Sequence, residues 1–194
     1  FVIGDIQGCY SEFKRLLKII DPMKKNKIFC VGDLVNRGPY SERVVDYVLN
    51  HKIKSVLGNH DYGEYTSWKS NEEKNRNFKN LIKAQKEFGW NLLLNENDTI
   101  SVDGNKIKVI GVENWASSRF QQYGNLDKAY NGLNNEDFKI LMTHNPSHWN
   151  AKVTDAYNDI DLTLSGHTHG LQYGIDIGDF RVSPVRLCLL YTSD

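Results

Sequence analysis

Short apolar runs, each bounded by glycine or polar residues, recur along the chain. Unbroken runs of three to six apolar residues are typical of strands that are buried on both faces. The predicted strands are 1–3, 28–31, 55–57, 107–112, 140–142 and 162–164.

Three intervals between these runs have helical periodicity instead. The interval 11–20 places its apolar residues on one stripe and is stopped by Pro22, and 41–50 has the same pattern. A third helix is expected over 75–88, with Gly89 as its terminator. Alternating strands and helices predict an α/β layered domain, in which ligands bind beyond the carboxyl ends of the strands.

A short polar motif follows five of the apolar runs. The motifs are Gly4-Asp5-Ile6-Gln7-Gly8, Gly32-Asp33-Leu34-Val35-Asn36-Arg37-Gly38, Gly58-Asn59-His60-Asp61, Met142-Thr143-His144-Asn145 and Gly166-His167-Thr168-His169-Gly170. They supply carboxylate and amide oxygens together with imidazoles, a ligand set that suits two divalent metals. One such motif alone is weak, but five in this order predict a metal centre.

The ligands divide between two metals. Asp33 is the expected bridge, because a carboxylate has two oxygens to share. The other expected ligands are Asp5 and His169 at one metal, and Asn59, His144 and His167 at the other. The His-x-His spacing on an extended loop predicts that both rings point the same way. Two metals roughly 4 Å apart would clamp a phosphate and lower the pKa of a bridging water toward ~7.

The charge of two divalent cations exceeds that of Asp5 and Asp33, so an anionic substrate is expected. Arg37 adds a planar fork suited to phosphate oxygens. His60 is placed to steady developing charge or to protonate the leaving group, with a structural role as the alternative. His51 is expected to cap a helix.

Two further pairs follow the predicted strand 107–112 and are expected at the same rim. Asn114 and Trp115, with Arg119 and Phe120 further on, are candidates for stacking on a base or holding a second phosphate. The alternative is that these aromatic residues pack the loop onto the helices. His148 is expected in the first turn of a helix, away from substrate.

The 194-residue chain is 40% hydrophobic, which fits one domain, expected over 1–186. Its 24 basic residues balance its 24 acidic residues, so no general electrostatic case exists for nucleic acid or a membrane surface. No apolar run reaches the ~18 residues of a membrane segment. The three cysteines, Cys9, Cys30 and Cys188, lack metal-type spacing and are expected to be reduced, as in the cytoplasm.

The sequence also leads to expectations for the two ends of the chain and for one internal interval. The chain begins at Phe1, inside a predicted strand and without an initiator Met, so a missing anchor that associates it with a membrane stays open. Residues 187–194 resemble a translated sequencing adapter and are expected to be a non-native tail, a short apolar strand being the alternative. The interval 62–101 is expected to form either a cap over the site or a helix packed on the sheet.

The five motifs resemble those of the calcineurin-like metallophosphoesterases, whose pattern runs Asp-x-His, Gly-Asp-x-x-Asp-Arg, Gly-Asn-His-Asp/Glu, His and Gly-His-x-His. The resemblance covers the chain from Phe1 to about Pro184. It implies a four-layer α-β-β-α fold, with two central mixed sheets flanked by helices, and a dinuclear metal-dependent phosphoric ester hydrolase.

Two positions depart from the family pattern. Gln7 stands where the family has a His ligand, and its amide is a weaker ligand for a transition metal. Asn36 stands where the family has an Asp; it can bond His60 but lacks the charge that would stabilise a protonated ring. Reduced activity or an altered pH optimum is therefore expected. The first two motifs resemble the symmetrical diadenosine tetraphosphatases, and the rest of the chain resembles small bacterial metallophosphoesterases.

We therefore expect hydrolysis of a phosphate ester or phosphoanhydride by water that two metals activate, the metals being Mn, Fe, Zn, Co or Ni. A phosphorylated small molecule is the expected partner, with a nucleotide or dinucleoside polyphosphate favoured as substrate. One alternative is a broad phosphomonoesterase or phosphodiesterase. Another, suggested by Gln7 and Asn36, is a weakly active metal-binding scaffold.

Overall fold

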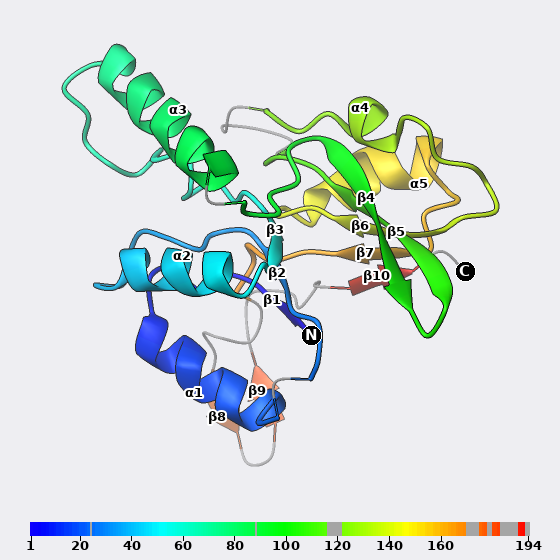
Figure 1. Ribbon diagram of the computed structural model, residues 1–194, viewed down its shortest axis with the longest axis horizontal. Helices are drawn as coiled ribbons and strands as arrows, with labels where there is room; N and C mark the ends of the chain where they lie inside the picture. Colours follow the sequence, from blue (N-terminus) through cyan, green and yellow to red (C-terminus); the bar gives the residue numbers. More distant parts are fainter. Residues whose placement is uncertain are drawn as a thin grey trace. The chain divides into compact units, whose positions relative to one another are not determined.

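The computed structural model describes residues 1–23, 25–87, 89–115, 122–169, 175–177, 180–182 and 190–192, with side chains up to residue 169 except those of 84–86. The chain consists of two compact units, Phe1–Leu92 and Leu93–Asp194 (Figure 1). Each unit has its own sheet and its own apolar core.

The first unit is built on a parallel sheet in the order β1-β2-β3. Its elements are β1 (Val2–Ile3), α1 (Tyr10–Ile20), β2 (Phe29–Val31), α2 (Ser41–Asn50), β3 (Lys54–Val56) and α3 (Asn71–Glu87). The register places Cys30 between Ile3 and Ser55. Because the three strands run in one direction, the motifs that follow them begin at one edge of the sheet.

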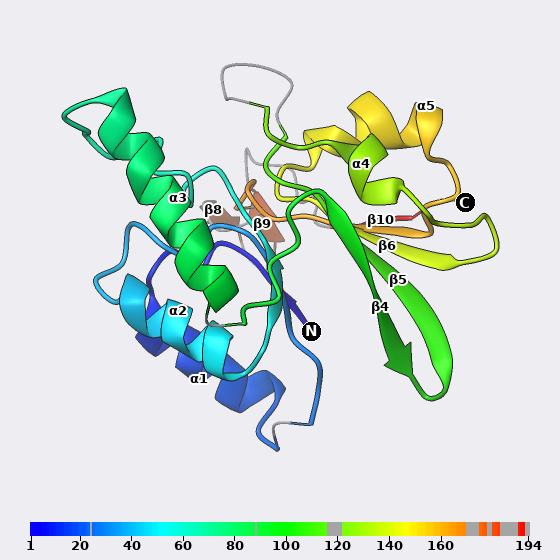
Figure 2. The same cartoon turned by 45° about the horizontal axis from the view of Figure 1, so that its top comes forward.

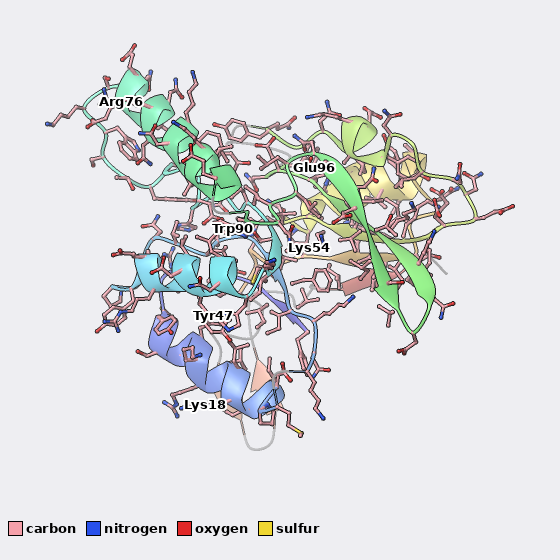
Figure 3. The ribbon with its side chains drawn as sticks, viewed as in Figure 1. Lys18, Tyr47, Lys54, Arg76, Trp90 and Glu96 are labelled. Atoms are coloured by element: carbon pink, nitrogen blue, oxygen red, sulfur yellow. The ribbon has the colours of Figure 1, made fainter. Side chains whose placement is uncertain are left out.

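Two amphipathic helices cover this small sheet. Phe13 and Leu17 of α1, with Val44 and Val48 of α2, are buried in one cluster with the strand residues. Tyr47 lies where the two helices meet, its ring 5.4 Å from that of Phe13 (Figure 3). The periodicity in the sequence therefore located both helices, because their apolar stripes are the faces that they bury.

Helix α3 differs from α1 and α2 in how it contacts the rest of the first unit. None of its described side chains is buried, and Arg76, labelled in Figure 3, is exposed. Phe78 stacks on Tyr62 with ring centroids 4.8 Å apart, and Lys74 Nζ lies 2.7 Å from Glu64 Oε1. Phe78, Leu81 and Ile82 are half-buried on one stripe of α3, and both the cap and the helix packed on the sheet stay predictions for this interval. Phe88, the predicted last residue of this helix, lies outside the described residues.

The second unit contains a mixed sheet in the order β10-β7-β6-β5-β4 and a separate antiparallel pair, β8 and β9. Its elements are β4 (Glu96–Val102), β5 (Asn105–Gly111), α4 (Leu126–Tyr130), β6 (Phe138–Met142), the π-helix η1 (Trp149–Val153) continuing as α5 (Thr154–Ala156), β7 (Leu162–Leu164), β8 (Ile175–Ile177), β9 (Phe180–Val182) and β10 (Leu190–Thr192). The central strands β5, β6 and β7 are parallel, while β4 and β10 pair antiparallel at the edges.

The core of the second unit lies between this sheet and its helices. Ile110 and Leu141 on the strands pack with Ala129 of α4 and Val153 of η1, all fully buried. Figure 2 shows α4 and α5 on one side of the sheet and the long β4–β5 hairpin extending from it. Helix and strand again alternate, which confirms the predicted α/β class with two sheets and flanking helices.

The six predicted strands are all present, to within a few residues at their ends. Strand β4 was not predicted because it is an edge strand without a buried residue, so it carries no apolar run. Of the predicted tail 187–194, the structure describes only β10, which pairs with β7. Among the helices that the structure describes, none is long and apolar enough to cross a membrane.

Candidate active site

Seven predicted site residues lie in the three loops that leave the carboxyl edge of the first sheet. Asp5 and Gln7 follow β1, Asp33, Asn36 and Arg37 follow β2, and Asn59 and His60 follow β3. Backbone hydrogen bonds continue the parallel pairing beyond the strands, from Asp5 N to Gly32 O (3.1 Å) and from Gln7 N to Asp33 O (2.8 Å). The first two motifs are thus fixed to each other by their main chains.

Two motif glycines allow the same loops to approach closely. Gly38 N donates to Gln7 O at 2.6 Å, and a Cβ added to Gly38 would lie 2.5 Å from the carbonyl carbon of Gly8. A side chain does not fit at that distance. The glycines therefore explain how the second motif can fold back over the first.

His60 is buried, and its ring and backbone contact two of the other motif residues. Its backbone N–H donates to Asp33 Oδ1 at 2.9 Å, and its Nε2 lies 3.9 Å from Asp33 Oδ2. The predicted contact with Asn36 is present, because Asn36 Nδ2 lies 3.0 Å from His60 Nδ1. Since an amide nitrogen can only donate, Nδ1 accepts and the ring proton is on Nε2.

Asp61 has a role that the sequence did not reveal. Its carboxylate is buried and accepts hydrogen bonds from four backbone N–H groups. These belong to Asp33 (2.8 Å), Leu34 (3.0 Å), Val35 (3.2 Å) and Gly58 (2.9 Å). Asp61 therefore holds the second and third motifs together. Its place directly after Asn59 and His60 in the third motif was the only signal for it.

The predicted histidines of the second unit follow two adjacent parallel strands. His144 follows β6 and is fully buried, while His167 and His169 follow β7 and are partly exposed. His167 Nδ1 lies 3.2 Å from His144 Nε2, and the two rings are nearly perpendicular at 74°. The structure therefore brings His144 and His167 together, as a shared cation would require.

The loop that carries His167 and His169 is not extended, contrary to the prediction. Both residues have left-handed backbone conformations, with φ of 70° and 48°, and Thr168 N bonds Gly166 O at 2.8 Å in a tight turn. The alternation of side chains in a strand does not apply to such a turn. The expectation of an extended loop is therefore wrong, and the alternation of side chains gives no reason for the two rings to point the same way.

Left-handed backbone is concentrated in the predicted site. Nine non-glycine residues of the described chain have positive φ, and six of them are predicted site residues. The six are Asp5, Gln7, Asp33, Asn36, His167 and His169. This conformation costs a residue with a side chain roughly 1–2 kcal/mol. Such strain persists where the surrounding structure enforces it, and it is most common at functional sites.

Asn114 and Trp115 follow β5, and both are buried. Trp115 stacks on His148 with ring centroids 4.7 Å apart, and His148 Nδ1 lies 3.1 Å from Thr143 Oγ1. His148 stands at the beginning of η1, as predicted. Packing thus accounts for Trp115, and contact of either residue with substrate stays a prediction. Arg119, Phe120 and Gly170 lie outside the described residues.

Burial of His148, with a smaller effect of the nearby Lys152 charge, lowers the pKa of this imidazole to about 4. An unfolded chain binds the proton near pH 6.5, whereas the folded chain does so only near pH 4. Stability should therefore fall by up to about 3 kcal/mol as the pH drops between those values. Urea unfolding at pH 7 and pH 4.5 checks this, and His148→Asn, which cannot titrate, should lose much less. Equal losses in both proteins would contradict the expectation.

Three residues that were expected to take no part in the chemistry, His51, Cys9 and Cys30, are among the described residues. His51 Nδ1 donates to Tyr47 O at 2.8 Å and ends α2, as predicted. Cys9 and Cys30 are free thiols, and burial together with the charge of Asp61 raises the pKa of Cys30 to about 12. A thiol in that state is not a nucleophile at neutral pH.

Residues 1–171, which contain the five motifs, match the family model described as calcineurin-like phosphoesterase. The chain belongs to the calcineurin-like phosphoesterase family. Members of this family use divalent metal ions. The predicted family is therefore confirmed, and the oxygen and imidazole groups of both units are of the kind that such ions bind.

Curated relatives carry a more specific name. The chain is 34% identical to the symmetrical bis(5'-nucleosyl)-tetraphosphatase of Nitrosospira multiformis, over 79% of this chain and 59% of the relative. It is 31% identical to the protein of that name from Buchnera aphidicola, over 79% of this chain and 60% of the relative. The chain thus spans about three fifths of the length of these two relatives.

Two solved structures share the fold. The NAD nucleotidase of Haemophilus influenzae matches 90% of this chain and 34% of its own, with a TM-score of 0.51 and 22% identity. A sulfate thiohydrolase of Thermus thermophilus matches 92% of this chain and 37% of its own, with a TM-score of 0.52 and 17% identity. At these identities the likeness supports the metallophosphoesterase fold alone.

Proposed function

We propose that this chain hydrolyses phosphate esters or phosphoanhydrides with two bound divalent metal ions. The observation that carries the proposal is that six of the proposed site residues have a left-handed backbone conformation. Their carboxylate, amide and imidazole groups lie in strained loops at the ends of parallel strands. Family membership supplies the reaction class.

The donor groups fit divalent metals of the first transition series. The proposed ligands are Asp5, Gln7, Asp33 and Asn59 of the first unit and His144, His167 and His169 of the second. Hard oxygens with imidazoles suit Mn, Fe, Zn, Co or Ni, and manganese is our first choice for assays. When bound, such metals polarise a phosphoryl oxygen and lower the pKa of a coordinated water toward ~7.

The chain's own residues would orient the substrate and handle its charge. Arg37 is an exposed residue of the second motif, and its guanidinium can bind phosphate oxygens in a bidentate manner. His60 carries its proton on Nε2, on the side of Asp33, and can donate a hydrogen bond to a phosphoryl or leaving-group oxygen. Asp61 keeps both motif loops in register.

A nucleotide or dinucleoside polyphosphate is the proposed substrate class, because the relatives are named as tetraphosphatases of bis(5'-nucleosyl) compounds. The proposed compartment is the cytoplasm, since Cys9 and Cys30 are free thiols. The second candidate is a metal-binding scaffold with little turnover. Gln7 and Asn36 favour it, because each replaces a charged or strongly ligating group.

A substrate panel separates these candidates. Purified chain would be assayed with Mn²⁺ against a chromogenic phosphomonoester, a phosphodiester and a symmetrical dinucleoside tetraphosphate, alongside metal analysis of the protein. Faster turnover of the dinucleotide supports the proposed substrate class. Turnover of the simple esters alone supports a broad phosphoesterase. Two bound metals with no turnover of any compound would establish the scaffold instead.

Replacing Asn36 by Asp tests whether the neutral amide limits the rate. The introduced carboxylate would accept a hydrogen bond from His60 Nδ1 and stabilise the protonated ring. The expected result is a rise in kcat of about tenfold, within the range of general acid catalysis. Steady-state assays of both proteins provide the measurement. A lower or unchanged kcat would show that Asn36 is no handicap.

A further inference from the structure

Tyr65 contacts two site residues, although no motif contains it. Its hydroxyl lies 2.9 Å from Asn59 Nδ2, which donates to it, and its ring stacks on His60 with centroids 4.2 Å apart and planes 19° from parallel. Tyr65 itself is 52% exposed, whereas Asn59 is 2% exposed. The hydroxyl of an exposed tyrosine can form its hydrogen bonds with water. The hydroxyl of Tyr65 instead contacts the buried Asn59, and this contact needs a physical explanation.

The chain between His60 and Tyr65 folds so that the tyrosine returns over the motif. Gly63 N bonds His60 O at 3.0 Å, and Thr66 N bonds Gly63 O at 3.2 Å, which makes two successive turns. Gly63 has φ of +71°, and Trp68 Nε1 donates to its carbonyl oxygen at 2.8 Å. The position of Tyr65 is therefore built by this turn.

The hydroxyl contact bears on how Asn59 can bind a metal. A carboxamide offers one oxygen and one nitrogen, and a metal ion accepts only the oxygen as a ligand. Tyr65 engages the nitrogen, so the orientation of the amide that keeps this contact makes Oδ1 the atom that would coordinate a metal. Groups that orient a ligand in this way typically change metal affinity by about 10- to 100-fold when they are removed.

The stacking of the Tyr65 ring fixes the orientation of His60, as the hydroxyl does for Asn59. The plane of the imidazole is fixed on one side by Tyr65 and at its Nδ1 edge by Asn36. Rotation of the ring would break both contacts at once. The direction of the Nε2 proton is therefore set by two residues from different segments, Tyr65 and Asn36.

We propose that Tyr65 is a positioning residue of the metal centre, with its hydroxyl aligning Asn59 and its ring aligning His60. The proposal rests on the proposed function, in which Asn59 binds metal and His60 donates to the substrate. Two substitutions separate these two effects. Tyr65→Phe removes only the hydroxyl, whereas Tyr65→Leu removes the ring contact as well.

The test combines calorimetric titration of the full chain with Mn²⁺, kcat at saturating Mn²⁺, and the unfolding temperature without metal. Tyr65→Phe should weaken Mn²⁺ binding by about tenfold. Tyr65→Leu should show that loss and, in addition, about a tenfold lower kcat. Both variants should unfold near the temperature of the wild type, because Tyr65 is half exposed.

Tyr47→Phe is the matched control, because Tyr47 also stacks on a histidine, His51, at 3.8 Å, but away from the motifs. Its Mn²⁺ affinity and kcat should equal those of the wild type. Unchanged Mn²⁺ affinity in Tyr65→Phe would overturn the proposal even if Tyr65→Leu failed to fold. If the wild type binds Mn²⁺ but turns over no ester, the proposed function fails, while weaker binding by Tyr65→Phe still supports the positioning of Asn59.

Discussion

His144→Ala is expected to lower the rate of phosphoester hydrolysis by about a thousandfold or more. A bound metal ion supplies several kcal/mol of transition-state stabilisation, which loss of a proposed ligand would remove, and each 1.36 kcal/mol is worth about tenfold in rate. His144 is fully buried, with its Nε2 3.2 Å from His167 Nδ1, so no other side chain can move into its place without repacking. The measurement is kcat/KM on whichever ester the wild type hydrolyses best, with metal content determined on the same sample.

His51→Ala is the matched control for this experiment. His51 is exposed at the end of α2, and within the described part of the chain its side chain bonds Tyr47 O of the same helix turn, so its loss should leave activity within about twofold of the wild type. If His144→Ala retained the wild-type rate, the proposed metal mechanism would be wrong. If His51→Ala lost as much, the assay would be reporting unfolding and not chemistry.

Asp61→Ala is expected to destabilise the protein by about 4 kcal/mol. Four backbone N–H groups would lose a charged acceptor, and each buried donor that is left without a partner costs about 1–3 kcal/mol, part of which water recovers. Asp61→Asn keeps one carbonyl oxygen, so it should cost about half as much. Urea unfolding curves at pH 7 give both values.

The control for Asp61 is Asp46→Ala on the exposed face of α2, which should change stability by less than about 0.5 kcal/mol. A loss in Asp61→Ala no larger than that of the control would mean that water replaces the carboxylate at all four N–H groups. The loops of the second and third motifs would then be held by other contacts.

The elements with buried faces were predictable from the sequence, because burial leaves a period in the chain. Helix α2 was predicted with its observed bounds, since Val44 and Val48 stand on one stripe. Strand β4 was missed for the opposite reason: Glu96–Val102 is an edge strand whose residues are exposed or half-buried, and its pairing with β5 is set by the main chain.

The candidate site was predictable as a set of residues but not as a set of contacts. Parallel strands place loop residues such as Asp5 and Asp33 at a common edge, which the pattern of apolar runs indicates. The four N–H bonds of Asp61 and the return of Tyr65 over Asn59 depend on turns that form only in the folded chain. The left-handed turn at His167 was likewise missed, because positive φ is uncommon even in histidine, which adopts it more often than most residues.

Helix α3 contributes no described side chain to the core, which has a consequence for how this protein can diversify. Among the described residues, Phe78 on Tyr62 and Lys74 with Glu64 connect the helix to the loop that carries Tyr65. Segments that bury few side chains accept insertion, deletion and replacement with little loss of folding stability. We therefore expect α3 to be the part of the chain that evolution or an engineer can exchange most freely. Grafting a different helix there would change what surrounds Tyr65 while the strained motif loops stayed intact.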